Sequence, residues 1–215
     1  IATQQLPFGV LEHTDAVINL AGAPIAGKKW TATYKQMIKT SRIESTRHIV
    51  ESMRNATSRP TILINASATG YYGDRADTVL TEHSPKGAGF LADVAEKWEQ
   101  EASVAQEFGT RVVCVRTAPV LGHGGILATL LRSARFGFLL MLSKKEFWQP
   151  WIHEDDIVNV YLFALQTATL QGAVNAVAPE EVTHHVFMKE IAHLIHRPIL
   201  GLARSGYCGN RQTIF

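Results

Sequence analysis

Two hydroxyl side chains and two phenols lie within seven consecutive residues, at the end of an apolar run of the chain. Ser67 and Thr69 are followed by Tyr71 and Tyr72 in the segment Ser-Ala-Thr-Gly-Tyr-Tyr-Gly. A hydroxyl group can polarise a substrate carbonyl, and a phenol can pass a proton to or from it. The segment therefore predicts catalytic roles for Ser67, Tyr71 and Tyr72 and a substrate contact for Thr69. The alternative is a tyrosine-rich turn with buried rings.

Tryptophan and histidine side chains elsewhere in the chain are weaker candidates for site residues. Trp151 and His153 directly precede a predicted helix, where both could contact a substrate, or His153 could instead anchor the loop. His193 and His196 stand three residues apart on another predicted helix, a spacing that metal sites use. No acidic or cysteine partner accompanies these histidines, so the sequence predicts no metal site.

The elements that must position these groups alternate between strand and helix. Continuous apolar runs predict buried strands over residues 15–19, 61–68 and 111–117. Helical spacing of apolar residues predicts helices between them, with Gly109 as a C-cap. The expected elements are helices over 31–55, 90–108, 124–135, 155–166 and 183–196 and a further short strand over 174–178. This order predicts an α/β, doubly wound fold with a parallel sheet and right-handed crossovers.

Ligands of such sheets bind in the crevice beyond the carboxyl ends of the strands. The segments that directly follow the predicted strands are therefore the ones to examine. Besides 67–73, they include Ala21-Gly22 and residues 116–122. Gly22 after Ala21 leaves room for a flat ligand against the backbone, or it is a packing turn.

Composition excludes several classes of protein and partner. The 215 residues are 46% hydrophobic and 19% charged, which is typical of a globular domain rather than of a disordered, collagenous or coiled-coil chain. The formal charge is +2 and the Lys and Arg residues are scattered, so we expect no nucleic-acid partner. The sequence contains no run of about 18 apolar residues, so we expect no membrane span. Two cysteines form no disulfide framework, and the opening residues do not resemble a signal peptide. We expect a cytoplasmic protein.

Several short segments occur in an order that is characteristic as a set. They are Asn19-Leu20-Ala21-Gly22, Ser41-Arg42, residues 67–73, Trp98-Glu99, Arg116-Thr117, Val120-Leu121-Gly122, Gly124-Gly125 and Trp151-Ile152-His153 with Asp155-Asp156. Together they resemble the NAD(P)-binding epimerase family proteins of the atypical, extended short-chain dehydrogenase/reductase superfamily, in the subgroup sometimes labelled cell-division-inhibitor-like. The resemblance covers about residues 13–200.

The resemblance implies a Rossmann-like domain over residues 1–173 that binds NADP, with NAD less favoured, and a small C-terminal substrate lobe over 174–215. Leu20 and Ala21 would line the adenine and ribose end of the cofactor, and Gly22 is also predicted to bind the cofactor. Arg42 would face the cofactor, where a guanidinium can pair with phosphate, and Val120 would lie near the nicotinamide. Ser67 matches the carbonyl-polarising hydroxyl of the superfamily. A homodimer is a further expectation, because the superfamily often dimerises.

Four features depart from the family pattern. The superfamily's Tyr-x-x-x-Lys dyad occurs nowhere in the chain, and Phe90 begins the helix that should carry it. A Gly-x-x-Gly-x-x-Gly turn is also missing, and the strand at 15–19 corresponds to the family's fourth, so N-terminal strands are expected to be missing. A chain complete as printed should therefore bind dinucleotide poorly. Bulky residues at 138–145 should reshape the substrate cleft, and residues 201–215 do not resemble the family's C-terminal extension.

Three functions remain open at this point. The first is an NADP-dependent oxidoreductase or epimerase/dehydratase-like enzyme that acts on a small hydroxylated or carbonyl compound, for example a sugar derivative. The second is a catalytically degenerate dinucleotide-binding module that senses redox state or binds a protein, which the missing dyad favours. The third is a structural α/β domain that binds no nucleotide.

Overall fold

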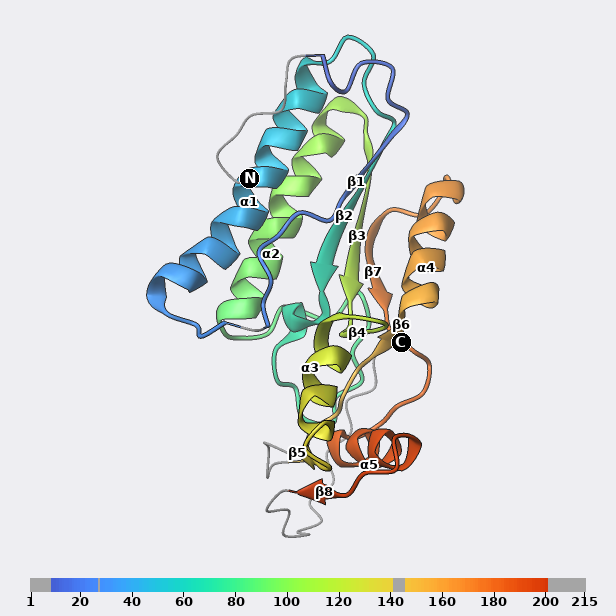
Figure 1. The fold of residues 1–215 in the computed structure, drawn as a ribbon. Coiled ribbons are helices and arrows are strands. Elements are labelled where there is room, and N and C mark those ends of the chain that lie inside the picture. Colours follow the sequence, from blue (N-terminus) through green and yellow to red (C-terminus); the bar gives the residue numbers. More distant parts are fainter. Residues whose placement is uncertain (1–8, 27, 141–145, 201–215) are drawn as a thin grey trace.

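The protein is described by a computed structural model that covers residues 9–26, 28–140 and 146–200 (Figure 1). Two expectations fall on other residues. The reshaping of the cleft by residues 138–145 lies largely outside the described residues, and the divergence of residues 201–215 lies wholly outside them.

A parallel sheet of four strands forms the centre of the larger part of the molecule, in the order β1-β2-β3-β7. The strands are β1 (Ala16–Asn19), β2 (Ile62–Ala68), β3 (Arg111–Thr117) and β7 (Gly172–Ala176). The predicted α/β class and the first three strands are thus confirmed. The last strand begins two residues earlier than predicted, at 172 rather than 174. It pairs with β3, so the predicted domain boundary after residue 173 falls inside a strand of the main sheet.

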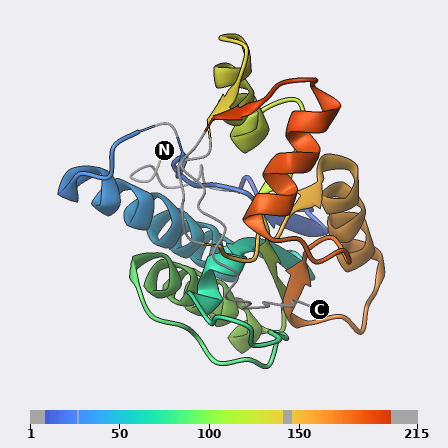
Figure 2. The ribbon, with the colours of Figure 1, turned by 90° about the horizontal axis from the view of Figure 1, so that it is seen from below.

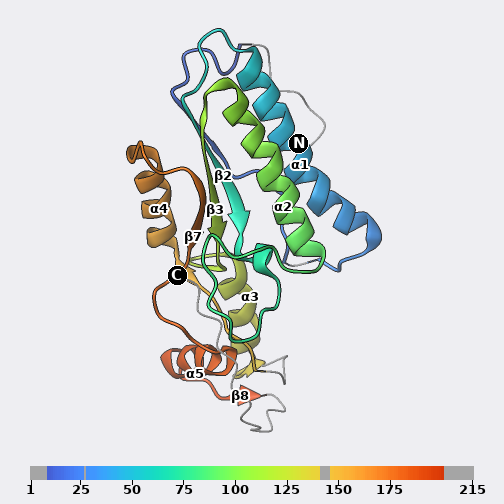
Figure 3. The same cartoon turned by 180° about the vertical axis from the view of Figure 1, so that it is seen from behind.

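Helices cover both faces of this sheet. Helices α1 (Ala32–Asn55) and α2 (Phe90–Ser103) lie side by side on one face, and α4 (Glu154–Gln166) lies on the other (Figures 1 and 3). Thr31 caps α1 by accepting a hydrogen bond from the backbone of Tyr34. The predicted helix over 90–108 ends as the 3₁₀ turn η2 (Val104–Phe108), and Gly109 follows with a left-handed φ of 86°, as its C-cap role requires.

Alternate residues of the strands supply the two halves of the core. Leu63, Val112 and Cys114 pack toward α1 and α2, whereas Ile64, Val113 and Val115 pack toward α4. Helices cover both faces of these strands, so every side chain of a strand is buried and must be apolar or have a polar partner. The continuous apolar runs therefore arise from burial on both faces.

A smaller lobe lies beyond the carboxyl ends of the strands (Figures 1 and 2). It contains α3 (Gly125–Ala134), α5 (His184–Leu194) and the paired strands β5 (Leu139–Leu140) and β8 (Ile199–Leu200), around a core with Leu139, Met188 and Ile191. Strands β4 (Val120–Leu121) and β6 (Ile152–His153) pair between sheet and lobe. These two-residue strands were not predicted, because so few residues carry no periodic pattern.

Strand β1 forms one edge of the main sheet. Ile18 is 46% exposed, although its register partner Ile64 on β2 is fully buried. Among the residues that the structure describes, no strand pairs with the outer side of β1. Val158, Leu162 and Phe163 on α4 are also exposed.

Within the same described ranges, no helix combines the length and the apolar character that crossing a membrane requires.

Candidate functional site

A row of polar side chains crosses three strands near their carboxyl ends. In the register of the sheet, Ser67 on β2 lies opposite Arg116 on β3, and Arg116 lies opposite Asn175 on β7. Register partners in a parallel sheet point to the same face, so the three side chains form a continuous line. The row therefore lies at the edge where ligands of doubly wound sheets bind.

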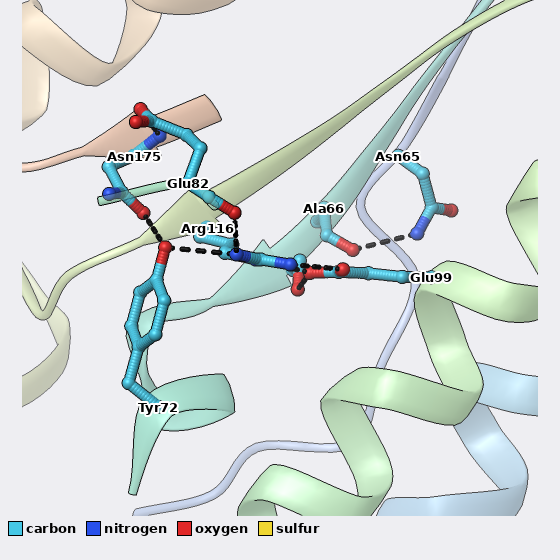
Figure 4. Close-up of polar contacts among 8 residues, drawn as sticks. Asn65, Ala66, Tyr72, Glu82, Glu99, Arg116 and Asn175 are labelled. Carbon is cyan, nitrogen blue, oxygen red and sulfur yellow. Dashed lines mark hydrogen bonds and ion pairs between the residues drawn. The ribbon is translucent and has the colours of Figure 1, made fainter. Parts of the chain in front are cut away.

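Arg116 is the centre of this row (Figure 4). Its guanidinium pairs with the carboxylate of Glu99 from α2 through Nε and Nη2, at 2.9 and 2.8 Å. Nη1 donates to the hydroxyl of Tyr72 at 2.9 Å and to the backbone carbonyl of Glu82 at 3.1 Å. Burial alone would lower the pKa of Arg116, but the hydrogen bonds to Glu99 and Tyr72 outweigh it and raise the pKa. Arg116 is thus a permanent cation with fixed partners.

Ser67 is already engaged in the same network. Its hydroxyl donates to Oε1 of Glu99 at 2.6 Å, and the residue is 5% exposed. A hydroxyl that gives its proton to a carboxylate can still accept a hydrogen bond, but it cannot donate one to a carbonyl. This arrangement leaves Ser67 as an acceptor.

The two tyrosines lie in the 3₁₀ turn η1 (Thr69–Tyr72) and differ in their surroundings. Tyr72 is fully buried, and its hydroxyl donates to Asn175 at 2.6 Å while accepting from Arg116. Burial raises the pKa of Tyr72, against the opposing effect of Arg116. Tyr71 is half-buried, and the Arg116 guanidinium lies 3.5 Å from the centre of its ring. Within the described part of the chain, neither the Tyr71 nor the Thr69 hydroxyl has a hydrogen-bond partner.

The predicted cofactor-binding residues lie after β1. Leu20 is 65% exposed, and the backbone N–H of Ala21 donates to the side chain of Asn19 at 3.1 Å. The side of Gly22 where a Cβ would stand is filled by Arg42, whose Cζ would lie 2.9 Å from that Cβ. The space there is therefore taken by a guanidinium rather than left for a ligand.

Arg42 is buried at 8% exposure and is bound to its own chain. Nη1 donates to the backbone carbonyls of Ala23 at 3.1 Å and Ile38 at 3.0 Å, and the guanidinium lies over the ring of Trp98. Burial lowers the pKa of Arg42. These contacts fix the loop after β1 to helix α1. They favour support of that loop over pairing with a phosphate.

The remaining predicted residues lie where the main sheet meets the smaller lobe. Val120 on β4 packs against the core beneath α4, and Trp151 packs against the core of the lobe. His153 caps α4, because its Nδ1 accepts from the backbone N–H of Asp155 at 3.2 Å. This is the anchoring role that the sequence left open for His153. In the part of the chain that is described, no three His, Cys, Asp or Glu side chains gather as a metal site.

The sequence placed Glu99 and Arg116 in characteristic segments but predicted no site role for them, and it did not single out Glu82 or Asn175 at all. One signal was available, because Arg116 is a charged residue in a largely apolar strand and directly follows four buried residues, 112–115. Such a residue requires a buried partner. The identity of that partner depends on the register between strands and on the packing of α2, which the sequence does not reveal.

Comparisons with known proteins agree with this architecture. Residues 7–177 match the NAD dependent epimerase/dehydratase family. An epimerase family protein of Staphylococcus haemolyticus is 38% identical over 86% of this chain and 62% of its own length. A chloroplastic epimerase family protein, SDR39U1 homolog, of Arabidopsis thaliana is 36% identical over 87% of this chain and 54% of its own length. The chain thus spans little more than half of these relatives.

Solved structures share the fold over almost the whole chain. Human epimerase family protein SDR39U1, solved with NADPH, superimposes with a TM-score of 0.79 at 27% identity, over 94% of this chain and 68% of its own. MoeE5, solved with UDP-glucuronic acid and NAD, superimposes with a TM-score of 0.78 at 17% identity, over 95% and 71% of the two chains, which shows the fold alone. With the family match, the parallel sheet and its flanking helices, the chain belongs to the NAD dependent epimerase/dehydratase family.

Proposed function

We propose that the protein is an NADP-dependent oxidoreductase or epimerase/dehydratase-like enzyme that acts on a small hydroxylated or carbonyl compound, with sugar derivatives as one substrate class. Family membership and the NADPH in the human relative support the cofactor. The observation that carries the proposal is the pair of unpartnered hydroxyls, Thr69 and Tyr71 among the described residues, at the carboxyl edge of the sheet. The homodimer and the cytoplasmic location stay predictions.

The four hydroxyl-bearing residues of segment 67–73 divide into two pairs. Ser67 and Tyr72 give their protons to Glu99 and Asn175, and both are buried. Thr69 and Tyr71 are half-buried and keep their protons available. We therefore assign the contact with the substrate carbonyl to Thr69 and the proton transfer to Tyr71, while Ser67 and Tyr72 hold the site together. Bound NADP supplies the hydride acceptor or donor.

Replacing Tyr71 by phenylalanine should slow turnover by about 100-fold, because general acid–base catalysis contributes factors of this size. Tyr72→Phe is the matched control. It keeps both rings and the Glu99–Arg116 pair, so it should lower the rate by no more than a few-fold. It should lower the free energy of unfolding by about 1–3 kcal/mol, because the Asn175 oxygen loses a buried donor. NADPH oxidation with a panel of carbonyl compounds, including nucleotide sugars, measures the rates. Equal rates for both variants would contradict the assignment.

The second candidate is a dinucleotide-binding module without catalysis, and the absence of a Tyr-x-x-x-Lys dyad favours it. The two functions differ in one experiment. A sensor binds NADPH tightly but oxidises it with no member of a broad carbonyl panel, whereas the enzyme turns over with at least one.

Arg42→Ala should weaken NADPH and NADH by the same factor. The guanidinium is held by the carbonyls of Ala23 and Ile38, so its loss loosens the loop after β1 whichever cofactor binds there. Dissociation constants from the fluorescence of the two reduced cofactors measure the effect. A loss confined to NADPH would instead assign Arg42 to the phosphate that distinguishes NADPH from NADH.

A further inference from the structure

We infer that Arg116 is a positioning residue for Tyr71, and that with Glu99 it holds the phenol ring in the orientation that the reaction needs. The inference deepens the proposed function and rests on the role of Tyr71 given there. It concerns a buried residue that acts through the ring it supports.

The contact between the two side chains is close and largely shielded from water. The guanidinium carbon of Arg116 lies 3.5 Å from the centre of the Tyr71 ring and 5.1 Å from that of Tyr72. The two rings meet edge to face, with centres 5.4 Å apart and planes at 85°. A cation over a ring face attracts the ring electrostatically, and more strongly once desolvated. Tyr71 is thus supported by Arg116 and by Tyr72 together.

Arg116 is itself fixed by groups from three parts of the chain. Glu99 holds it from α2, the Tyr72 hydroxyl from η1, and the Glu82 carbonyl from the loop that follows η1. The planar fork of a guanidinium can make these contacts while its flat face packs on a ring. An ammonium group has only three donors and no flat face, so it cannot make all four hydrogen bonds and also stack on the ring. The structure therefore requires arginine here and not only a positive charge.

Two other cationic side chains near η1 have other partners. The Arg75 guanidinium donates to the backbone carbonyls of Tyr72, Pro85 and Lys86. The Lys86 ammonium pairs with Asp93 and Glu96 on the outside of α2. Among the described residues, Arg116 is thus the cation that meets the ring of Tyr71. In a chain without the superfamily's Tyr-x-x-x-Lys dyad, the cation beside the tyrosine therefore comes from strand β3.

The test is a double-mutant cycle between Tyr71 and the buried ion pair. Glu99→Leu with Arg116→Met removes both charges together, so that neither is left buried alone. In the full-length protein this pair variant should lower kcat by about 10- to 100-fold, the size of effect that a misplaced reacting group produces. The KM for a carbonyl substrate and the Kd for NADPH should change less than about threefold. In a Tyr71→Phe background the same pair variant should have almost no further effect on kcat.

The matched control is the Arg47–Glu101 pair, which also joins an arginine to a glutamate of α2 but lies on the surface. Arg47→Met with Glu101→Leu should leave kcat unchanged. Arg116→Lys is a second variant of the site. It keeps the charge and should still lose rate, and again only when Tyr71 is present.

The outcomes separate the inference from the proposed function. If the pair variant lowers kcat by the same factor in the Tyr71→Phe background as in the wild type, Arg116 does not act through Tyr71. That result overturns the inference but leaves the proposed function intact. Full activity of Arg116→Lys overturns it as well, because the guanidinium plane is then not needed. If Tyr71→Phe by itself leaves turnover unchanged, the proposed role of Tyr71 fails first and the inference fails with it.

Discussion

Glu99→Leu alone should destabilise the protein by about 3–5 kcal/mol, because Arg116 would remain buried without its counter-charge. The side chains of Arg116 and Glu99 are 5% and 15% exposed, and their ion pair spans 2.8 Å. Arg116 is an arginine with a raised pKa, so it cannot escape by losing its proton. Ser67 would also lose the acceptor of its hydroxyl.

Urea unfolding of three variants measures this cost. The pair variant Glu99→Leu with Arg116→Met should recover most of the loss, because a buried ion pair replaced by apolar side chains is often nearly neutral. Glu101→Leu breaks the exposed pair with Arg47 and should cost no more than about 1 kcal/mol. A Glu99→Leu protein as stable as the wild type would show that water reaches Arg116 and screens its charge.

Much of the fold followed from the sequence because the strands are buried on both faces. A continuous run such as residues 111–117 can be recognised without knowing its neighbours, and the helices between the runs dictate parallel pairing. The caps were also readable, since Thr31 and Gly109 occupy positions with known preferences. The sequence did not predict that β7 lies beside β3. The strand that the sequence assigned to the C-terminal lobe is this β7 of the main sheet.

The sequence predicted where the site lies, but not which of its hydroxyl groups are available to a substrate. Residues 67–73 do lie at the carboxyl edge of the sheet, as the strand ends predicted. Ser67 and Tyr72 looked as available as Thr69 and Tyr71, however, because a sequence does not show which hydroxyls already have partners. Those partners, Glu99 and Asn175, are 32 and 103 residues away. Only the register of the strands and the docking of α2 bring them together.

The second large effect is expected for Gly87→Ala, which should cost about 3 kcal/mol in stability and displace both tyrosines of η1. A Cβ on Gly87 would lie 1.9 Å from the backbone oxygen of Tyr72 and 2.7 Å from the backbone nitrogen of Gly73. The backbone N–H of Gly87 donates to the carbonyl of Tyr71 at 3.0 Å, so the two segments are already in contact. Backbone atoms on both sides cannot swing aside as a side chain can. The substitution must therefore separate the loop from η1.

Unfolding by urea and the rate of NADPH oxidation together measure this effect, with Gly124→Ala as the control. A Cβ on Gly124 meets no atom within 4 Å, and the residue is exposed before α3. Its substitution should change the stability by no more than about 0.5 kcal/mol and leave the rate unaltered. Gly87→Ala should lower both stability and rate, because Tyr71 loses its position relative to Arg116. A variant that is less stable but fully active would mean that η1 keeps its place when the loop moves, and that the ion pair alone holds Tyr71.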